Sequence, residues 1–538
     1  MVKYQSRQSA LTLILIIIVI MVGGMFMGGC RSIKPEKTPL SAILEPLASE
    51  TPTILESEMP PDPSHTPGAL ALVPVVEEED TPKPTIVPTN TSTPTPGPSE
   101  TPVPPLVVTP ITPQFPMMGI EIISFNDIEL AAQAGAYWVR RNALLWSVVE
   151  PAEGNRNWGA VATLERELES ISAHGMHTIL IVRGTPSWAQ KTLGIHCGPV
   201  KYEKLEEFAV FMHDAVVRYS QPPYNVKYWE LGNEPDVDPA LVLADSPYGC
   251  WGDPEDAYYG GGYYAEMMKA VYPAIKSADP EAQVLVGGLL MLCDPVNPPD
   301  VYGQPGVKSD CSPAKFMEGV LRNGGGNYFD GVSFHAYDYY YGELGKYGND
   351  SWRSSWKSTG PVLIAKANYL YKLLARYGFY DKFLMNTETA ALCGVTGNED
   401  PCWQEDWTNT KAYHLVEAFT TAATLELRAN IWFCLTGWRG SSLVDTNRQP
   451  VPAYQALAFN NQMLQGATPW GEVTLYQGVK GFAFQRDGNL IWVLWSLDGQ
   501  DHYIPLGSLP GAVYGVFGES LTPNLNITIT LSPIYIKW

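Results

Sequence analysis

The chain reads YWELGNEP over residues Tyr228–Pro235, where an apolar run ends in the polar pair Asn233-Glu234. The run is short and rich in aromatic and aliphatic residues, as is typical of a buried strand in a parallel sheet. We predict the strand itself at Val226–Leu231. Seven similar runs lie on either side of it, at Met118–Ile123, Tyr137–Asn142, His177–Arg183, Gln283–Leu290, Phe329–His335, Phe383–Thr389 and Asn430–Thr436.

Helical patterns separate these eight runs. We predict helices at Asp127–Ala134, Leu164–His174, Leu205–Tyr219, Tyr263–Ser277, Pro313–Arg322, Ile364–Tyr377 and Tyr413–Leu427. Strands that alternate with helices indicate parallel βαβ units, and eight units close most naturally into a (β/α)8 barrel. We therefore expect an α/β fold with a barrel over residues 116–465. A doubly wound open sheet is the alternative, but no glycine-rich phosphate loop follows the first strand.

The C-terminal segment, residues 466–538, has a period of two instead. Its short strands are separated by Asp-Gly, Pro-Gly and Gly-Glu turns, and the first of them is predicted at Glu472–Gln477. This pattern predicts a small antiparallel β-sandwich that packs on the barrel.

Residues 1–30 carry the pattern of an export signal. Lys3 and Arg7 precede an apolar run from Leu11 to Phe26, and small residues then precede Cys30. The end of this segment resembles the lipobox of bacterial lipoproteins, which implies lipidation of Cys30. An uncleaved signal anchor is the alternative, since the apolar run is nearly long enough to span a bilayer. Both interpretations place the rest of the chain outside the cytoplasm, anchored to a membrane.

Residues 31–115 are dense in Pro, Thr, Ser and Glu. Such a segment has too little apolar surface to offset its conformational entropy, so we predict a disordered linker. Its prolines favour extended polyproline II structure, which would hold a domain away from the membrane.

The formal net charge of the chain is −21, from 56 acidic and 35 basic residues. This balance argues against nucleic acid as a partner, because few cations are available to neutralise phosphates. It also argues against attachment to anionic lipid through basic residues. No protein partner is implied.

Six of the eight cysteines lie in loop-like contexts beyond residue 115, which makes them disulfide candidates in an exported protein. The nearest neighbours are Cys393 with Cys402 and Cys293 with Cys311, which leaves Cys197 with Cys250, although the connectivity stays open. Cys434 lies in an apolar run and is predicted to be a buried free thiol.

Two predicted strands deliver a glutamate to their carboxyl ends. Glu234 follows the fourth strand, and Glu388 lies in Asn386-Thr387-Glu388-Thr389 at the end of the seventh. The active site of a (β/α)8 barrel lies at the carboxyl ends of its strands. Two carboxyl groups that face each other there are what the cleavage of a glycosidic bond requires.

Most of residues 116–538 resembles clan A of the retaining glycoside hydrolases, in particular families 39 and 5. The resemblance rests on the two glutamate motifs, on Val139-Arg140, on Thr185-Pro186-Ser187-Trp188 and on Ser333-Phe334-His335-Ala336-Tyr337. It implies that Glu234 is the acid/base and Glu388 the nucleophile of a double displacement. Two carboxyl groups about 5–5.5 Å apart are expected for this mechanism, whereas a separation beyond about 6.5 Å indicates inversion.

The resemblance also implies supporting residues. Asn233 would bind the sugar 2-hydroxyl, and Arg140 would keep the nucleophile ionised, although Arg140 could instead pair with Glu230 inside the barrel. His335 and Tyr337 would orient the two glutamates. Flat surfaces for sugar rings are expected from Trp432, Trp188 and Trp438, with a plain core role as the alternative for Trp432.

The sequence thus predicts a membrane-anchored retaining glycoside hydrolase that cleaves an extracellular oligo- or polysaccharide without a cofactor or metal. A non-catalytic surface glycan-binding lipoprotein on the same barrel is the alternative function. A second alternative is a lipoprotein in which the barrel is only a scaffold.

Overall fold

The computed structural model describes residues 118–538, except 244–247, 302–303, 357–358, 394–401 and 403. The predicted export signal with Cys30 and the predicted linker over 31–115 lie outside the described residues.

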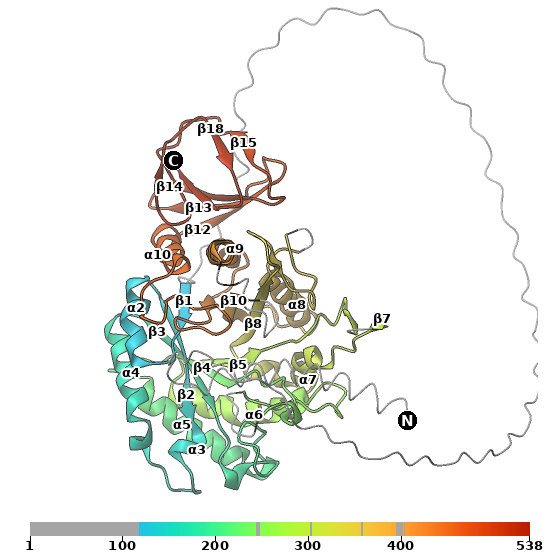
Figure 1. Ribbon diagram of the computed structural model, residues 1–538. Coiled ribbons are helices and arrows are strands. Elements are labelled where there is room, and N and C mark those ends of the chain that lie inside the picture. The colour runs from blue at the N-terminus through green and yellow to red at the C-terminus, as the bar shows by residue number, and fades with distance from the viewer. Residues whose placement is uncertain (1–117, 244–247, 302–303, 357–358, 394–401, 403) are drawn as a thin grey trace, which may run out of the picture. The chain divides into compact units, whose positions relative to one another are not determined.

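A closed barrel of eight parallel strands forms the centre of the described chain (Figure 1). Each strand pairs with the next in chain order, and the last pairs with the first, so the sheet has no open end within the barrel. The eight strands are β1 (Met118–Glu121), β2 (Trp138–Leu145), β3 (His177–Arg183), β4 (Tyr228–Asn233), β5 (Gln283–Leu289), β8 (Gly331–Tyr340), β10 (Phe383–Leu392) and β11 (Ala429–Trp432). The predicted barrel is confirmed, and the open sheet is not found.

Helices follow the strands as predicted. The predicted seven are α2 (Ile128–Gln133), α4 (Ala162–Ala173), α5 (Leu205–Tyr219), α6 (Gly261–Ala278), α7 (Phe316–Arg322), α8 (Val362–Arg376) and α9 (Glu405–Thr424). The four-residue helix α3 (Trp146–Val149), directly after β2, was not predicted. Short 3-10 turns are η1 (Phe125–Asp127), η2 (Trp158–Val161), η3 (Ser187–Ala189), η4 (Tyr202–Lys204), η5 (Pro239–Leu241), η6 (Ser312–Lys315) and η7 (Gly325–Asn327). The long loops after β5 and β8 carry the hairpin β6 (Asp300–Val301) and β7 (Gln304–Lys308) and the strand β9 (Tyr347–Gly348).

The longer helix α10 (Pro452–Leu464) was not predicted either. Its buried face includes the amides of Asn460 and Asn461, which interrupt the apolar periodicity from which helices are recognised. Asn461 donates its amide nitrogen to the carbonyl oxygen of Ala134, 2.7 Å away, and Asn460 Oδ1 accepts from the Tyr535 hydroxyl.

The barrel interior is apolar near the amino ends of the strands and charged near their carboxyl ends. Trp138 and Tyr228 pack in the lower, apolar layer. Two residues further along the same strands, Arg140 and Glu230 face the same interior, and both are fully buried. The residues between them point outward, as Trp229 does into the layer of helices.

The C-terminal segment forms antiparallel sheets, as predicted. A six-stranded sheet contains β12 (Thr468–Glu472), β13 (Val479–Arg486), β14 (Asn489–Ser496), β19 (Ile534–Lys537), β16 (Ala512–Tyr514) and β17 (Ser520–Leu521), and a two-stranded sheet contains β15 (His502–Pro505) and β18 (Asn526–Ile529). The prediction of the first strand at Glu472–Gln477 was wrong: the strand is Thr468–Glu472, where Pro469 and the irregularity at Gly471 obscure the alternation.

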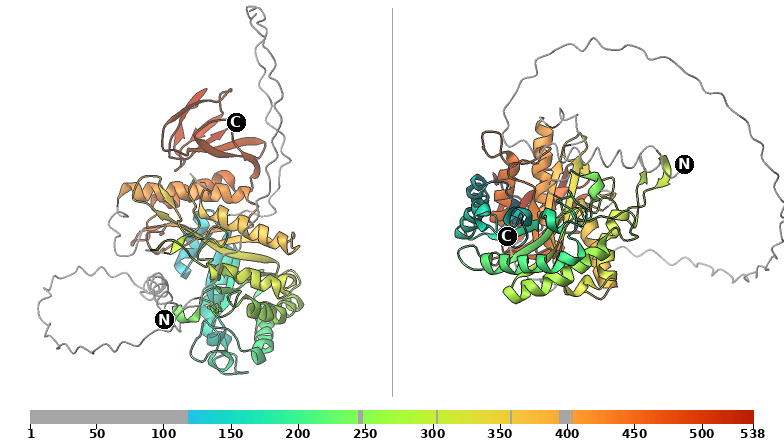
Figure 2. Two further views of the ribbon diagram at one scale, coloured as in Figure 1. Left: turned by 90° about the vertical axis from the view of Figure 1, so that its right-hand side faces the viewer. Right: turned by 90° about the horizontal axis from the view of Figure 1, so that it is seen from below.

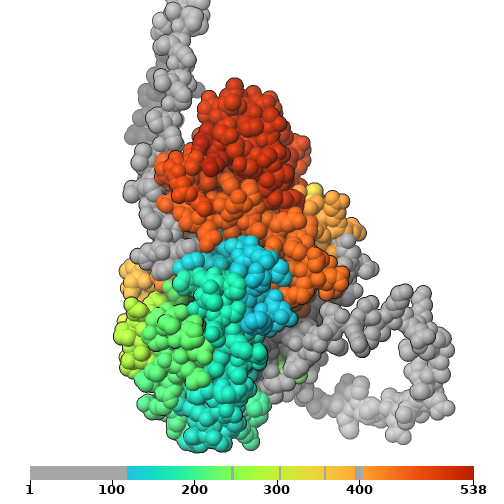
Figure 3. All heavy atoms as spheres, turned by 90° about the vertical axis from the view of Figure 1, so that its left-hand side faces the viewer, coloured from blue at the N-terminus to red at the C-terminus, as the bar shows by residue number. Residues whose placement is uncertain are grey.

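The C-terminal sheets share a hydrophobic core with the barrel. One buried cluster unites Phe419 of α9 and Leu457 of α10 with Trp495 and Tyr535 of the large sheet. The Tyr535 hydroxyl donates to Asn460 Oδ1 at 3.0 Å. The space-filling view shows the C-terminal segment in direct contact with the segment that contains α10, and a second ribbon view shows the same neighbours (Figures 2 and 3).

Within the part of the chain that the structure describes, no helix has both the length and the apolarity needed to cross a membrane.

We expect Tyr535→Ala to lower the free energy of unfolding by about 3–5 kcal/mol, because it empties a fully buried aromatic site. Tyr535→Phe should cost only about 1 kcal/mol, the value of one buried hydrogen bond. Denaturant unfolding of the full chain measures both. A loss in the Ala variant no larger than that in the Phe variant would contradict a core shared between the barrel and the C-terminal sheets.

Candidate active site

Glu234 and Glu388 meet at the carboxyl end of the barrel. Glu234 directly follows β4 and Glu388 lies in β10, and they are only 2% and 5% exposed. His335 of β8 lies between them, with Nδ1 2.8 Å from Glu234 Oε1 and 3.4 Å from Glu388 Oε2. One oxygen of each carboxyl group and a ring nitrogen of His335 all lie within 4.8 Å of one another.

The backbone around Glu234 is shaped to turn its side chain into the mouth. Glu234 has φ 55° and Gly232 has φ 91°, both in the left-handed region that disfavours ordinary side chains. The Glu234 amide donates to the carbonyl oxygen of Gly288 at 2.9 Å, which holds this turn against β5. A Cβ at Gly288 would lie 2.1 Å from His335 Nε2, so glycine is required there.

A β-bulge directs Glu388. The pairing of β10 with β8 shifts between Asn386 and Glu388, which leaves Thr387 as an extra residue. Strict alternation would send consecutive side chains to opposite faces. Here the Thr387 hydroxyl donates to Glu230 Oε1 at 3.1 Å inside the barrel, while Glu388 also reaches the central charged cluster.

Arg140 is the centre of that cluster and is fully buried. Its Nε and Nη2 donate to the two oxygens of Glu230 at 2.8 and 3.1 Å. Its Nη1 donates to Glu121 at 2.6 Å and to Glu388 at 2.5 Å. Its Nη2 also donates to Asn233 Oδ1 at 2.7 Å. Arg140 therefore pairs with Glu230, as the alternative interpretation expected, and contacts Glu388 at the same time.

The Asn233 amide is oriented by this contact. Because its oxygen accepts from Arg140, its amide nitrogen is directed elsewhere and can donate to a ligand. Asn233 is the last residue of β4 and is 4% exposed, directly before Glu234.

The two candidate catalytic carboxyl groups have different electrostatic surroundings. Burial, followed by the charges of Glu388 and Asp236, raises the pKa of Glu234 well above its usual value. Burial also raises the pKa of Glu388, but the Arg140 charge and the hydrogen bond from the Tyr337 hydroxyl oppose this rise. Glu234 is thus the group that favours the protonated form, and burial contributes more to this than the neighbouring carboxylate does.

Further ionisable groups support the pair. Burial, with the charges of Arg140 and Lys366, lowers the pKa of His335 well below its usual value, so its imidazole is neutral. Lys366 of α8 donates to the carbonyl oxygens of His335 and Leu290, each at 2.7 Å. Burial lowers the pKa of Lys366 to about 8 and raises that of Glu121 to about 8.

Several of these residues were not predicted. Glu121 ends an apolar strand, as Glu388 does, and Lys366 falls on the apolar face of its helix, so both left a signal in the sequence. Asp236 accepts the backbone amides of Leu290 and Met291 at 2.9 and 2.7 Å, a role that no sequence pattern indicates.

A fourth unpredicted residue is Tyr248, in the loop after β4. It is buried, and its pKa is raised well above its usual value by burial and by the nearby charges of Glu234 and Glu388. Nothing in the sequence around it distinguishes it from the other tyrosines of the long loops.

The three predicted aromatic surfaces lie in different surroundings. Trp432 is fully buried in the shared core, where its indole donates to the Ser441 carbonyl oxygen at 2.9 Å and faces the His414 ring. Trp188 is half-buried and packs edge-on against Trp146. Trp438 is also half-buried, and the Arg439 guanidinium lies 5.2 Å from the centre of its ring.

Three disulfides brace the loops around the mouth and confirm the expected pairs. Cys197–Cys250 joins the loops after β3 and β4, Cys293–Cys311 closes the loop after β5, and Cys393–Cys402 closes the loop after β10. Cys434 is free and buried, as predicted.

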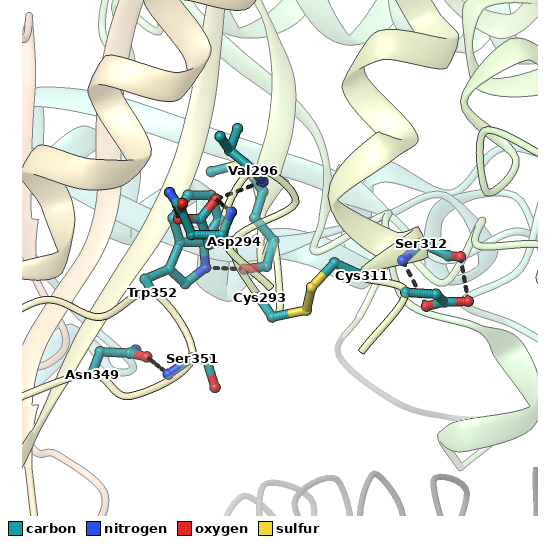
Figure 4. The surroundings of a disulfide bond; sticks show 11 residues. Cys293, Asp294, Val296, Cys311, Ser312, Asn349, Ser351 and Trp352 are labelled. Atoms are coloured by element: carbon teal, nitrogen blue, oxygen red, sulfur yellow. Dashed lines mark hydrogen bonds between the residues drawn. A yellow bond between two sulfur atoms is a disulfide. The ribbon is translucent and has the colours of Figure 1, made fainter. Parts of the chain in front are cut away.

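The surroundings of the Cys293–Cys311 bridge are ordered by hydrogen bonds (Figure 4). The Trp352 indole donates to the Met291 carbonyl oxygen at 2.8 Å, next to the contact of Met291 with Asp236. Asp294 accepts the backbone amide of Val296 at 2.8 Å.

Among the described residues, Glu234, His335 and Glu388 are also the group that lies close enough together to ligate a metal ion. We interpret the group instead as an acid pair with an orienting imidazole, since His335 already bonds Glu234 and Arg140 already neutralises Glu388.

No protein-family model matches the sequence, and a search of curated proteins finds no match either. Solved structures do match. A family 39 glycoside hydrolase from Bacteroides cellulosilyticus WH2 has 19% sequence identity and a TM-score of 0.56, over 80% of this chain and 82% of that one. A family 30 subfamily 8 xylanase from Clostridium acetobutylicum has 12% identity and a TM-score of 0.53, over 80% and 97% of the two chains.

A third similar structure is described as a conserved exported protein from Bacteroides fragilis. It has 12% identity and a TM-score of 0.52, over 79% of this chain and 99% of that one. At these identities the comparisons show a shared fold, and they confirm the fold that the resemblance to clan A implied.

We expect Arg140→Gln to destabilise the protein by about 3–5 kcal/mol at neutral pH, because it leaves buried carboxylates without their counter-charge. Those groups favour protonation once the guanidinium is gone, so the loss should be largest at pH 8 and shrink toward pH 5. Denaturant unfolding at both pH values measures it.

Arg218→Gln is the matched control, since Arg218 pairs with Glu165 on the outer helices and is 38% exposed. Its effect should stay below about 1 kcal/mol at either pH. An Arg140 variant that behaves like this control would show that the cluster does not depend on Arg140.

Proposed function

We propose that the chain is a retaining glycoside hydrolase that cleaves the glycosidic bonds of an extracellular oligo- or polysaccharide. The observation that carries the proposal is the position of Glu234 and Glu388 at the carboxyl ends of two barrel strands, with one oxygen of each within 4.8 Å. Oxygens this close are compatible with the carboxyl separation of about 5–5.5 Å that is typical of retaining enzymes.

In the first step, Glu388 attacks the anomeric carbon and Glu234 donates its proton to the departing oxygen. The raised pKa of Glu234 suits a general acid, and the Arg140 and Tyr337 donors favour the ionised form of Glu388 that a nucleophile requires. The carbon–oxygen bond to the leaving group breaks as the glycosyl–Glu388 ester forms.

In the second step, water hydrolyses that ester and Glu234 accepts the proton of the water. Loss of the proton in the first step prepares Glu234 for this role. Asn233, fixed by Arg140, is placed to donate its amide to the sugar beside Glu388, a contact that strengthens in the transition state. We propose that His335 and Tyr337 orient the two carboxyl groups.

We further propose that Trp188 and Trp438 contribute surfaces around bound sugar units. Trp432 is fully buried and is assigned the plain core role, which was its alternative. The three disulfides support an oxidising, extracytoplasmic location. Membrane attachment through Cys30 or an uncleaved anchor stays a proposal from the sequence.

Azide rescue of the full chain tests the two roles separately, with a panel of activated aryl glycosides. Glu388→Gly should lose activity by several orders of magnitude, and azide should restore it with a glycosyl azide of inverted configuration. Glu234→Ala should still form the glycosyl–enzyme from substrates with the best leaving groups, and azide should then yield a glycosyl azide of retained configuration. The same azide product from both variants would refute the assignment of roles.

The alternative function, a surface glycan-binding lipoprotein, predicts that the parent chain and both variants bind glycans equally and turn over none. Calorimetry with the same panel would reveal that result.

The pH profile of kcat/KM provides a further prediction. Activity needs an ionised Glu388 and a protonated Glu234, so it should fall at low pH as Glu388 gains its proton and at high pH as Glu234 loses its own. Tyr337→Phe removes a donor that lowers the pKa of Glu388, so the acidic limb should move to higher pH by about one unit.

Tyr340→Phe is the matched control on the same strand, because the Tyr340 ring packs against Trp407 outside the cluster. Neither limb should move in that variant. An acidic limb unchanged in Tyr337→Phe would show that Glu388 does not control it.

A further inference from the structure

Arg183, at the carboxyl end of β3, is a cation with no counter-charge among the described residues. Its Nε donates to the neutral Asn142 Oδ1 at 2.5 Å, and no carboxylate of the described residues forms an ion pair with it. Two other arginines on the neighbouring strand are paired, Arg140 with three carboxylates and Arg141 with Glu167.

The electrostatic surroundings make this arrangement costly. The chain contains 56 acidic and 35 basic residues, so counter-charges are abundant, yet none of the described ones is placed here. Burial, with the charge of Arg141, lowers the pKa of Arg183 to about 10. Arg183 is nevertheless cationic at neutral pH and only partly exposed, so an anion beside it would relieve the cost of partly withdrawing the charge from water.

A small cavity of about 30 Å³ lies at this position. Arg183, Gly184 and Thr185 line it together with Gly232 and Gly249. Its other walls are mostly apolar and come from Trp146, Val182, Cys197, Val200, Phe208, Leu231 and Trp251. Gly232 is two residues before Glu234, so the cavity adjoins the strand end that carries the acid/base candidate.

We propose that Arg183 forms an anion-binding subsite next to the catalytic pair and binds the carboxylate of a uronic acid unit in the glycan. The inference rests on the proposed glycosidase function and names its substrate class. A cavity of this size has room for one or two waters, and hence for a carboxylate group, but not for a sugar ring. The ring would stay at the mouth while its carboxylate reaches Arg183.

The shape of the guanidinium favours a carboxylate. Asn142 occupies only Nε, which leaves both terminal nitrogens to donate to two coplanar oxygens. A sulfate ester on a glycan would offer a similar negative charge to Arg183, so the experiment distinguishes carboxylated glycans from sulfated ones.

The test compares acidic glycans with their own neutral forms. Glucuronoxylan and pectic oligosaccharides are assayed with the full chain before and after chemical reduction of the carboxylates to alcohols, and a sulfated galactan is assayed before and after desulfation. We expect the unreduced uronate glycan to be preferred, and Arg183→Gln to lower kcat/KM on it about 10- to 100-fold, mainly through KM. On the reduced form the variant should change activity less than about twofold.

Arg183→Lys keeps the charge but not the planar fork and should retain part of the preference, which keeps the proposal testable if Arg183→Gln folds poorly. Arg218→Gln changes the net charge equally on the outer helices and should leave the preference intact.

Binding to Glu388→Gln, measured by calorimetry, separates this inference from the proposed function. If uronate binding depends on Arg183 but the parent chain turns over no glycan, the proposed subsite is supported and the proposed glycosidase function is rejected. If the chain turns over unreduced and reduced glycans equally well, the proposed glycosidase function is supported and the proposed subsite is overturned. A preference confined to the sulfated galactan would overturn the carboxylate assignment in favour of sulfate.

Discussion

The contact of one buried guanidinium with three carboxylates is the constraint on which the rest of the site depends. Arg140 bonds Glu121, Glu230 and Glu388 from the centre of the barrel, and all of these groups are almost completely withdrawn from water. Buried carboxylates are tolerated only when they are paired or protonated. The barrel provides both solutions, because Arg140 neutralises part of the charge and burial raises the pKa of Glu121 to about 8. The same guanidinium also fixes Asn233, so charge balance and the orientation of the site come from one side chain.

The asymmetry between the two central glutamates follows from what each one touches. Glu388 accepts from Arg140 and Tyr337, whereas Glu234 is bonded to a neutral His335 and has the charges of Glu388 and Asp236 nearby. The environments therefore push two chemically identical groups toward different protonation states, which is the condition that acid and nucleophile roles require. The disulfides in the loops after β3, β4, β5 and β10 stabilise the backbone around this pair.

Much of this architecture was predictable, because strand runs and helices follow simple periodicities. The eight barrel strands, the seven helices between them and the three disulfide pairs were expected from the sequence and are found in the structure. Helix α10 was missed because Asn460 and Asn461 are buried on its inner face. The bulge at Thr387 could not be foreseen, since it depends on the register with β8 and not on local sequence. Tyr248 and Asp236 were missed because loop geometry alone brings them to the site.

The anomeric configuration of the first product tests the central claim most directly. Once an accepted glycoside is identified, NMR spectra recorded in the first minutes of hydrolysis distinguish the two anomers before mutarotation mixes them. Carboxyl oxygens within 4.8 Å of each other fit direct attack by Glu388 better than attack by a water held between the two groups, so the account predicts a product with the configuration of the substrate. A first product of inverted configuration would contradict it, because Glu388 would then be a general base and not a nucleophile.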